Sequence, residues 1–432
     1  MSNWDTASLA AADKRFVWHP FTSLADWCQP GHEPIILVGG EGATLRDSRG
    51  REYIDGNSSI WTNIHGHNHP HLNAAISAQL RRVAHTSFLG FTHPPAIELA
   101  RRLIGLFPSG TMSRVFFSDD GSTAIEAALR IVEQFWALRG SHRRQFIAFR
   151  DAYHGDTAGA ASLGAAIMFG LGQGGWCFPG RTVSGMEELE ALSAGEAAET
   201  AAVVIEPIVQ GAAGMKMWPA GTLVALRRWC DANDVLLIAD EVLTGFGRTG
   251  KMFACEHDGV LPDMMTLGKA LSGGYLPIAA TVVSEKVSAE FERDNSSQRT
   301  LFYGHSYTAN ALAAAAANAS LDLFDDGSLL AANAGKALEL QRGLELISRR
   351  PAVAEVRVCG LIGAIDLEDQ TPGRGAEVCV AARKHGLLTR PIRNTIVLMP
   401  PYCISMEELQ RAILAIERGL TDVFGDAERG AK

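Results

Sequence analysis

The fold class of this chain is decided by residues 114–140, which read RVFFSDDGSTAIEAALRIVEQFWALRG. The first part is a short run rich in Val and Phe, and the second has the spacing of an amphipathic helix that ends at Gly140. The same alternation continues in apolar runs at residues 145–155, 201–211, 235–245, 263–271 and 278–285. Continuous apolar strands separated by helices predict a mostly parallel sheet that is covered on both faces. We therefore expect one large α/β domain over residues 66–320.

The C-terminal part of the chain has a different pattern. Residues 353–368 and 389–402 read as strands of hairpin type, whereas residues 375–386 and 406–424 have helical periodicity. Strands and helices that are separated along the chain in this way predict a smaller α+β domain.

The N-terminal segment contains a further hairpin signal, ATLRDSRGREYIDG at residues 43–56. A single hairpin is marginally stable alone and needs another element to pack against. We therefore assign residues 1–65 together with residues 321–432 to the small domain.

Composition bounds the class of protein. The chain has 432 residues, more than one hydrophobic core usually supports, and it is 47% hydrophobic with a formal net charge of −9. The charges are of mixed sign without a basic stripe, which argues against nucleic acid as a partner. The alanine-rich run at residues 311–324 is too short and too polar to span a bilayer, so no membrane partner is expected.

The cysteines and the N-terminus indicate the compartment. Seven cysteines are scattered without a CxxC pair, which favours free thiols over disulfides or a metal site. The first residues, MSNWDTASLAAADKRF, lack the apolar region of a signal peptide. These features predict a cytoplasmic protein without a bound metal.

Four groups of unusual residues follow predicted strands, and ligands collect at the carboxyl ends of strands in open α/β sheets. The first group is Gly121, Ser122 and Thr123, which follow a strand and begin a helix. The free N–H groups and the dipole of a helix start favour an anion such as phosphate. The same hydroxyls also suit an ordinary N-cap, so this pattern alone leaves both interpretations open.

Two carboxylates and an aromatic ring form the next two groups. Asp240 ends the apolar run VLLIA and precedes Glu241; a carboxylate there is costly unless it meets a cation, such as a protonated ring nitrogen. A solvent-facing acid or a helix cap is the alternative. Tyr153, followed by His154 and Asp156, comes after another strand, and its ring would either stack on a planar ligand or pack in the core.

The fourth group is Lys269, in the stretch DMMTLGKALSGG at residues 263–274. Apolar surroundings disfavour a charged amine, so its pKa is expected to fall, and a neutral amine forms Schiff bases with carbonyls. A lysine that extends from a strand end into water is the alternative. Taken together, phosphate donors, a stacking ring, a carboxylate for a ring nitrogen and a Schiff-base lysine are what pyridoxal 5'-phosphate requires.

Longer stretches carry a specific resemblance over nearly the whole chain. The chain resembles the class III aminotransferases of fold type I in YHGDT (153–157), EPIVQG (206–211), ADEVLTGFGRTGKMFACEH (239–257) and LGKALSGGYLP (267–277). Within that class, it resembles the 7,8-diaminopelargonic acid synthases, which are the 8-amino-7-oxononanoate aminotransferases of biotin synthesis, at residues 15–24, 56–70, 84–100, 302–310 and 389–402.

The resemblance implies roles for the residues at the strand ends. Lys269 would carry the cofactor and move protons during transamination. Asp240 would keep the pyridine nitrogen protonated, and Tyr153 would stack on the cofactor and line the substrate site. Gly121 and Ser122 would bind the phosphate.

The resemblance also implies a homodimer with active sites at the interface. In the GHS segment, His305 and Ser306 would reach the phosphate bound by the partner subunit, and Gly304 would lie near the substrate. Arg390 would pair with the carboxylate of the oxononanoate, a contact that suits guanidinium geometry, and Arg393 is the neighbouring candidate.

An apolar wall for the acceptor is implied as well, because an apolar slot suits a long carbon chain. Its members would be Trp18, Phe21, Ile60, Trp61 and Tyr402, and simple core packing is the alternative for each of them.

Two features depart from the most familiar synthases. Members that take the amino group from S-adenosylmethionine typically have tyrosine at the position of Phe21 and a Trp-Trp pair at Ile60 and Trp61. Members that use lysine as donor look closer, and the missing hydroxyl removes a hydrogen bond worth about 1–3 kcal/mol. The predicted amino donor is therefore lysine or S-adenosylmethionine, with lysine favoured. The second departure, the glycine-rich stretch MFGLGQGGWCFPG at residues 168–180, predicts an unusual entrance loop.

The main prediction is therefore a two-step transamination in which an amine donor and a keto-acid acceptor react in turn. An ω-amino acid or diamine:pyruvate aminotransferase with the same machinery is the nearest alternative. An aminomutase, and a non-catalytic relative that only binds ligands, are further alternatives; the presence of both Lys269 and Asp240 disfavours the last.

Overall fold

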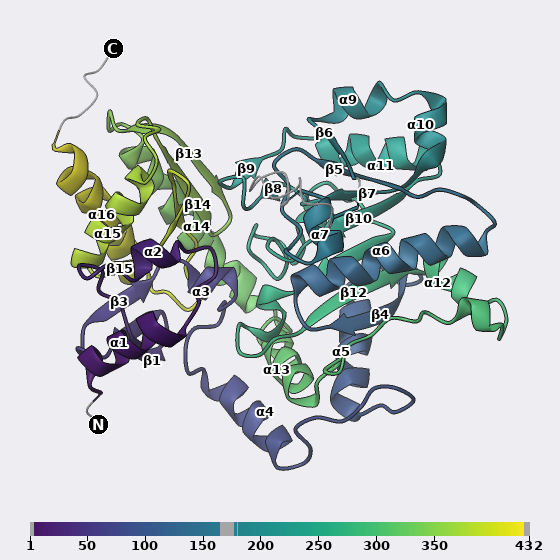
Figure 1. Cartoon of the computed structure of the whole chain (residues 1–432), viewed down its shortest axis with the longest axis horizontal. Helices are drawn as coiled ribbons and strands as arrows, with labels where there is room; N and C mark the ends of the chain where they lie inside the picture. Colours follow the sequence, from purple (N-terminus) through teal and green to yellow (C-terminus); the bar gives the residue numbers. More distant parts are fainter. Residues whose placement is uncertain (1–3, 165–176, 179, 427–432) are drawn as a thin grey trace.

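The structure, a computed structural model, describes residues 4–164, 177–178 and 180–426. Figure 1 shows a large sheet covered by helices on one side of the molecule, and a second group of strands and helices that combines the two ends of the chain. In the part of the chain that is described, no helix is long and apolar enough to cross a membrane.

The large sheet has seven strands in the order β4-β12-β11-β10-β7-β5-β6. The strand β12 is antiparallel to both of its neighbours, and the other pairs are parallel. This confirms the predicted α/β class with a mostly parallel sheet. The strands are β4 (Met112–Ser118), β5 (Gln145–Phe149), β6 (Arg181–Val183), β7 (Thr200–Ile205), β10 (Leu236–Asp240), β11 (Met264–Leu267) and β12 (Ala279–Ser284).

Helices cover both faces of this sheet, which explains why its strands are continuously apolar. In β10, Leu237 and Ala239 belong to one hydrophobic cluster, and Leu236 and Ile238 belong to another on the opposite face. The helix α6 (Gly121–Leu138) packs in the second cluster. The first cluster includes residues of α5 (Pro94–Gly105), α11 (Thr222–Ala232) and α13 (Ala311–Asp322).

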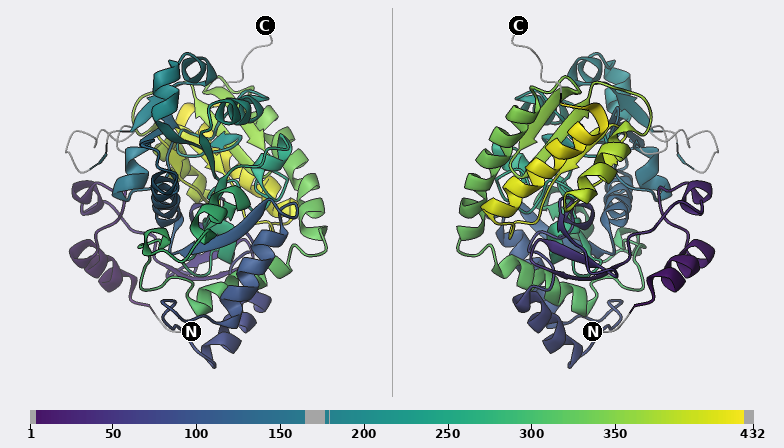
Figure 2. Two further views of the ribbon diagram at one scale, coloured as in Figure 1. Left: turned by 90° about the vertical axis from the view of Figure 1, so that its right-hand side faces the viewer. Right: turned by 90° about the vertical axis from the view of Figure 1, so that its left-hand side faces the viewer.

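The C-terminal part forms a four-stranded antiparallel sheet in the order β13-β14-β17-β16, as the hairpin patterns predict. Three helices pack with it, and in the right-hand view of Figure 2 these green-to-yellow helices lie side by side on one face. The elements are α14 (Ser328–Ile347), β13 (Val353–Cys359), β14 (Ile362–Leu367), α15 (Arg374–Lys384), β16 (Pro391–Ile392), β17 (Thr395–Leu398) and α16 (Met406–Phe424).

The N-terminal hairpin is joined to the C-terminal part by backbone pairing. A second four-stranded sheet has the order β1-β2-β3-β15, and Ile54 and Leu387 are partners in the parallel pair β3–β15. Its strands are β1 (Leu37–Glu41), β2 (Thr44–Asp47), β3 (Glu52–Asp55) and β15 (Leu387–Leu388). The boundaries at residues 65 and 320 stay a prediction.

Shorter elements complete the described part of the chain. They are the helices α1 (Thr6–Phe16), α2 (Leu24–Trp27), α3 (Ser58–Trp61), α4 (Pro70–Leu80), α7 (Ala158–Ser162), α9 (Met186–Glu190), α10 (Ala194–Glu199) and α12 (Glu285–Glu292), the 3-10 helices η2 (Ala254–His257), η3 (Lys269–Ser272) and η4 (Ser297–Arg299), and the strands β8 (Val209–Gln210) and β9 (Lys216–Met217).

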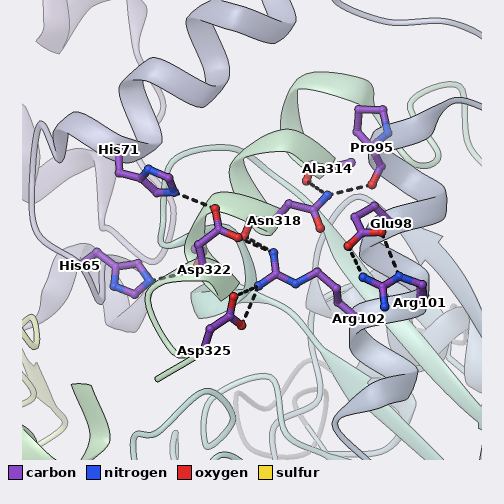
Figure 3. Close-up of polar contacts among 11 residues, drawn as sticks. His65, His71, Pro95, Glu98, Arg101, Arg102, Ala314, Asn318, Asp322 and Asp325 are labelled. Carbon is purple, nitrogen blue, oxygen red and sulfur yellow. Dashed lines mark hydrogen bonds and ion pairs between the residues drawn. The ribbon is translucent and has the colours of Figure 1, made fainter. Parts of the chain in front are cut away.

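A polar network ties α4 and α5 to the end of the alanine-rich helix α13. Figure 3 shows the Arg102 guanidinium between the carboxylates of Asp322 and Asp325, at 2.6 and 2.9 Å. The His71 ring nitrogen Nε2 lies 2.7 Å from the second oxygen of Asp322. These pairs fix the helices that precede and follow the large sheet.

Candidate active site

A cavity of about 780 Å³ lies where the ends of the large-sheet strands meet the N-terminal segment and the small C-terminal sheet. Most of the predicted site residues line it. They are Phe21, Ile60, Trp61, Gly121, Ser122, Tyr153, Asp240, Lys269, Arg390 and Arg393. Residues that are far apart in the sequence therefore share one space.

Asp240 ends β10 and is held by three donors. Its Oδ2 accepts a 2.6 Å hydrogen bond from His154 Nδ1, and its Oδ1 accepts from the Thr266 hydroxyl at 3.2 Å and the Val242 N–H at 3.1 Å. Burial by itself lowers the pKa of His154, but the hydrogen bond and the charge of Asp240 outweigh it, so the pKa of His154 is raised. The hydrogen bond from His154 fixes the orientation of the Asp240 carboxylate, whose remaining lone pairs can accept a further N–H.

Lys269 follows β11 with a positive φ of 38°. In the described part of the chain, no hydrogen bond or ion pair holds its amine, which lies 5.3 Å from the centre of the Trp61 ring. The side chain is partly buried and lines the cavity, and burial lowers the pKa of Lys269. The predicted direction of this shift agrees with the structure, and an unpaired amine of lowered pKa is suited to react with a carbonyl.

The start of α6 differs from the sequence prediction in one detail. The N-cap is Asp120, not Ser122 or Thr123: its carboxylate accepts the Thr123 N–H at 2.9 Å, and the Thr123 hydroxyl accepts the Asp120 N–H at 2.9 Å. An anionic side chain takes the capping position because it also interacts favourably with the helix dipole. Gly121 and Ser122, whose N–H groups belong to the first turn and have no intrahelical acceptor, are residues of the cavity lining.

Gly155 shows how closely the backbone approaches this helix start. Its φ is 127°, and a Cβ at this position would lie 2.1 Å from Ser122 Oγ. Glycine is therefore required for the turn that brings Asp156, whose N–H donates to Ser122 Oγ at 3.2 Å, against the first turn of α6. The result is a cradle of backbone N–H groups of the kind that binds phosphate.

Tyr153 lies between these groups. Its hydroxyl donates to Asp156 Oδ2 at 2.7 Å, and its N–H donates to Glu206 Oε1 at 3.1 Å. Burial and the Asp156 carboxylate raise the pKa of the Tyr153 hydroxyl. The ring therefore stays neutral and fixed at the cavity wall, as stacking on a planar ligand requires.

Glu206 is a cavity residue that the sequence analysis did not single out. It directly follows β7 and accepts N–H groups from Tyr153 and, at 2.8 Å, from Gly211. Burial raises its pKa to about 7, with a further contribution from the charge of Asp240. The sequence contains the pattern that would have identified it, a carboxylate directly after an apolar run: Glu206 follows AAVVI as Asp240 follows VLLIA.

Glu241, the second carboxylate after β10, does not line the cavity. It accepts from the Thr244 hydroxyl at 2.6 Å and from the N–H groups of Ala254 and Cys255 at 2.9 and 2.8 Å. Burial raises its pKa. This residue thus fixes the loop after β10.

The opposite side of the cavity is built from less regular backbone. Phe21 has a φ of 50° and is 60% exposed. Arg390 and Arg393 flank the short strand β16, and in the described residues neither guanidinium forms an ion pair. Unpaired guanidinium groups beside an apolar wall are suited to bind a carboxylate on a long chain.

The helix α3 is a left-handed turn. Ser58, Ser59, Ile60 and Trp61 have φ values of 43°, 49°, 66° and 67°. For L-residues this conformation costs about 1–2 kcal/mol per residue, and it is rarest for β-branched side chains such as Ile60. The Trp61 indole donates to Asn57 Oδ1 at 2.7 Å, which fixes the ring that faces Lys269.

Two predicted wall residues lie elsewhere. Tyr402 is 1% exposed; its hydroxyl donates to the Phe246 carbonyl at 2.7 Å, and its ring packs on the Arg248 guanidinium. The prediction that Tyr402 lines the acceptor wall is therefore wrong. A buried hydroxyl needs a hydrogen-bond partner, and that of Tyr402 is a carbonyl in the core. Trp18 is 80% exposed and does not line the cavity.

The GHS segment also lies outside the cavity lining. His305 Nδ1 is 3.1 Å from Asp119 Oδ2, and Asp119 does line the cavity. Gly304 and Ser306 are exposed beside it. The predicted roles of these three residues stay predictions. The predicted entrance loop at 168–180 falls outside the described residues, apart from 177, 178 and 180.

The donors present fit pyridoxal 5'-phosphate. A free buried amine, a carboxylate held at the end of a strand, a stacking ring and a helix start with a glycine-shaped cradle face the same space. No group of three metal-ligating side chains occurs in the part of the chain that the structure describes.

Comparisons with known proteins agree with this chemistry. A family model described as "Aminotransferase class-III" matches residues 28–420. A Geobacter sulfurreducens protein named adenosylmethionine-8-amino-7-oxononanoate aminotransferase is 40% identical, with 98% of this chain and 100% of that protein covered. One of the same name from Nitratidesulfovibrio vulgaris is 43% identical over 99% of this chain and 83% of that protein.

Solved structures agree as well. The crystal structure of adenosylmethionine-8-amino-7-oxononanoate aminotransferase from Methanocaldococcus jannaschii has a TM-score of 0.93 and 33% identity, covering 97% of this chain and 100% of that chain. An amine transaminase from an uncultivated Pseudomonas species, in its PLP-bound form, has a TM-score of 0.88 and 32% identity, covering 94% and 99%.

Proposed function

Because the chain belongs to the class III aminotransferases, which use pyridoxal 5'-phosphate, we propose that it transfers an amino group to 8-amino-7-oxononanoate in biotin synthesis. The observation that carries the proposal is the composition of one cavity. An unpaired buried amine at Lys269 shares it with the apolar side chains of Ile60 and Trp61 and with the unpaired guanidinium of Arg390. These groups match a substrate with a reacting carbonyl, a long apolar chain and a terminal carboxylate.

The bound cofactor supplies an aldehyde that condenses with amines and a ring that withdraws electrons from the reacting carbon. The protein residues prepare both functions. Asp240, with His154 behind it, would accept the N–H of the ring nitrogen and so hold that proton in place. The N–H groups of Gly121 and Ser122 would bind the phosphate, and Tyr153 would stack on the ring.

Lys269 moves the proton during transfer. A neutral amine accepts a proton from the substrate carbon and returns it to a neighbouring atom, so its pKa has to lie below that of a lysine in water. Burial provides this shift. The aromatic face of Trp61 beside the amine offers no N–H or O–H donor, so the lone pair of the amine stays available for the proton.

Arg390 orients the acceptor. Its guanidinium binds the terminal carboxylate, and the chain then extends along Ile60 and Trp61 toward Lys269. Arg393, on the other side of β16, is the second carboxylate ligand in this arrangement.

Two observations favour different amine donors. The names of the relatives contain adenosylmethionine, which supports S-adenosylmethionine. The absence of a hydroxyl at Phe21 supports lysine, as the sequence predicts. The substitution Phe21→Tyr tests this prediction directly, because it should raise kcat/KM with S-adenosylmethionine by up to about tenfold and leave the lysine rate unchanged. If the parent enzyme uses S-adenosylmethionine and not lysine, the prediction of lysine is wrong.

The active unit in this proposal is a homodimer. The exposed side chains of Leu89, Phe91, Phe302 and Tyr307 support it, and a ring contact of 4.7 Å between His85 and Tyr307 brings their two segments together. Sedimentation analysis should give twice the chain mass, and a stable active monomer would contradict this part of the proposal.

A cytoplasmic location also belongs to the proposal. All seven cysteines of the chain are free thiols in the structure, as a reducing compartment maintains them. Localisation of the tagged full-length chain in cells tests this part.

The central experiment is a product assay. Purified holoenzyme is mixed with 8-amino-7-oxononanoate and either lysine or S-adenosylmethionine, and 7,8-diaminononanoate is measured by mass spectrometry. We expect product with one of the donors and none with the Lys269→Ala variant. If pyruvate is aminated instead and the oxononanoate is not, the chain is an ω-amino acid or diamine:pyruvate aminotransferase.

A further inference from the structure

The left-handed turn α3 is held by a buried carboxylate outside the cavity lining, that of Asp55. This residue ends β3 and is 3% exposed. Its Oδ1 accepts the N–H groups of Asn57 at 3.3 Å and Ser59 at 3.1 Å, and its Oδ2 accepts the Ser59 hydroxyl at 2.9 Å. One carboxylate therefore contacts the turn both at its start and in its interior.

The same carboxylate also reaches the chain beyond the turn. His67 Nε2 lies 2.9 Å from Asp55 Oδ2, and His67 Nδ1 pairs with the Asn63 side-chain amide at 3.0 Å. The Ser58 hydroxyl donates to the Met399 carbonyl at 2.7 Å, which attaches the turn to the end of β17. Asp55 thus closes a loop of contacts around the strained residues.

This arrangement determines where the wall side chains lie. A left-handed turn of residues other than glycine persists only where the surroundings hold it, and such strain is typically found at functional sites. Ile60 and Trp61 project from the turn into the cavity, with Trp61 beside the amine of Lys269. If the turn unwinds, both side chains leave the path of the substrate.

We propose that Asp55 is a positioning residue that sets substrate specificity: it keeps α3 wound in the left-handed form and so holds Ile60 and Trp61 against the chain of the acceptor. The inference rests on the proposed function, because it takes these two side chains as the wall for a long substrate. Asp55 itself touches no reacting group.

The test compares Asp55→Asn with a matched control, Asp47→Asn. Asp47 is also buried, at 2% exposure, and ends the neighbouring strand β2 of the same sheet. It accepts from the Arg51 side chain and the Tyr53 hydroxyl, and none of its hydrogen bonds in the described residues reaches α3. Both substitutions remove a buried charge from one sheet, but only the first loosens the turn.

The measurement is KM and kcat of each holoenzyme with two acceptors, 8-amino-7-oxononanoate and pyruvate. For Asp55→Asn we expect KM for the long acceptor to rise about tenfold, because misplacement of a positioning group by about 1 Å has effects of this order or larger. The values for pyruvate, which is too short to need the wall, should stay within about twofold. Asp47→Asn should leave KM for both acceptors unchanged. An equal rise in KM for both acceptors in both variants would overturn the proposal.

A second pair of variants separates the strain from a general loss of structure. Ser59 has a φ of 49°, which glycine adopts freely and alanine does not. We expect Asp55→Asn with Ser59→Gly to regain most of the lost affinity for the long acceptor, and Asp55→Asn with Ser59→Ala to regain none. Equal KM values for the two double variants would show that Asp55 does not act through the turn. If Asp55→Asn is too unstable to purify, Ser59→Gly and Ser59→Ala are compared in the parent chain, because both remove the hydroxyl that donates to Asp55 and only glycine adopts the φ freely. Equal KM values for the long acceptor in these two variants would overturn the proposal.

The outcome for the parent enzyme distinguishes the two proposals. If the parent does not aminate 8-amino-7-oxononanoate, the proposed function is wrong. The same variants are then compared with 1-phenylethylamine as a bulky donor and pyruvate as acceptor. KM for that donor should be raised in Asp55→Asn and in its combination with Ser59→Ala, and should be lower in its combination with Ser59→Gly. An unchanged KM in Asp55→Asn would overturn the positioning role.

Discussion

The two sides of the cavity are built in different ways. The side that faces the cofactor uses the ends of regular strands, where Asp240 and Glu206 are buried and each accepts at least two hydrogen bonds. The side that faces the substrate uses irregular backbone, with positive φ angles at Phe21, Ile60 and Trp61. The chemical step thus rests on a rigid scaffold, and the choice of substrate rests on segments whose conformation other residues have to maintain.

The largest expected effect lies on the cofactor side. Lys269→Ala should lower kcat by about 10⁴-fold or more, because in the proposed mechanism the amine both carries the cofactor and moves the proton. The readout is product formation under saturating substrate. A control is Lys336→Ala: burial also lowers the pKa of this lysine, but it donates to the Tyr402 carbonyl away from the cavity. If Lys269→Ala kept its activity, the assignment of the chemical step to the cofactor side of the cavity would be wrong.

The next effect concerns the carboxylate at the end of β10. Asp240→Asn should lower kcat about 10³-fold, since a neutral amide does not hold the proton of the ring nitrogen. The matched variant is Asp263→Asn, a carboxylate of similar burial that is paired with Arg227 at 2.8 Å and lies before β11. It should lose thermal stability and keep kcat. Similar kcat values in the two variants would contradict the role of Asp240.

A smaller effect, and one confined to the substrate side, is expected for the guanidinium groups. Arg390→Ala should raise KM for 8-amino-7-oxononanoate about 10–100-fold, the loss typical of a charge-assisted hydrogen-bond pair, and should leave the rate of the donor half-reaction unchanged. Arg393→Ala should raise the same KM less. If the larger change occurs in Arg393→Ala, the assignment of the two arginines is reversed.

The last prediction concerns stability. The pKa of Glu206 in the folded chain is about 7, above its ordinary value of 4.5, so the folded state favours the protonated form. Its stabilising contribution is present below pH 4.5 and is lost as the pH rises through about 7, a change of roughly 3 kcal/mol in the free energy of unfolding. In Glu206→Gln, the free energy of unfolding should no longer fall by this amount as the pH rises.

Denaturant unfolding of the cofactor-free protein at pH 5 and pH 8 measures this change. The partly exposed Glu196, whose pKa is lowered to about 2 by its hydrogen bonds to Arg181 and Ser193, provides the control. Its stabilising contribution is lost only as the pH falls toward 2, so Glu196→Gln should leave the difference between pH 5 and pH 8 as it is in the parent. An unchanged difference in Glu206→Gln would show that this carboxylate is not strained by burial.

The same contrast explains which parts of the site the sequence could predict. Lys269 and Asp240 follow apolar strands, and a charge in that position is a local signal. Glu206 carries the same signal and was missed only because its run continues into the apolar residues PIV. The fold class followed from the same alternation of strands and helices, and it is confirmed.

The substrate side gave no comparable local signal. Phe21 and Ile60 were identified only through family resemblance. Both have a positive φ, which the identity of a residue other than glycine does not predict. Tyr402 was misplaced because its partners, the Phe246 carbonyl and the Arg248 guanidinium, are distant in sequence. The contacts of Asp55 depend on the same long-range assembly.

The pairing of the first strands with the last ones also has a consequence for biogenesis. Ser58 and Met399, which bond directly, are 341 positions apart, and β3 has its parallel neighbour only in β15. During translation, the N-terminal hairpin emerges first, and the edge of β3 stays unpaired until the residues of β15 have been synthesised. Nascent chains that stall before β15 should therefore contain every strand of the seven-stranded sheet but lack the parallel partner of β3.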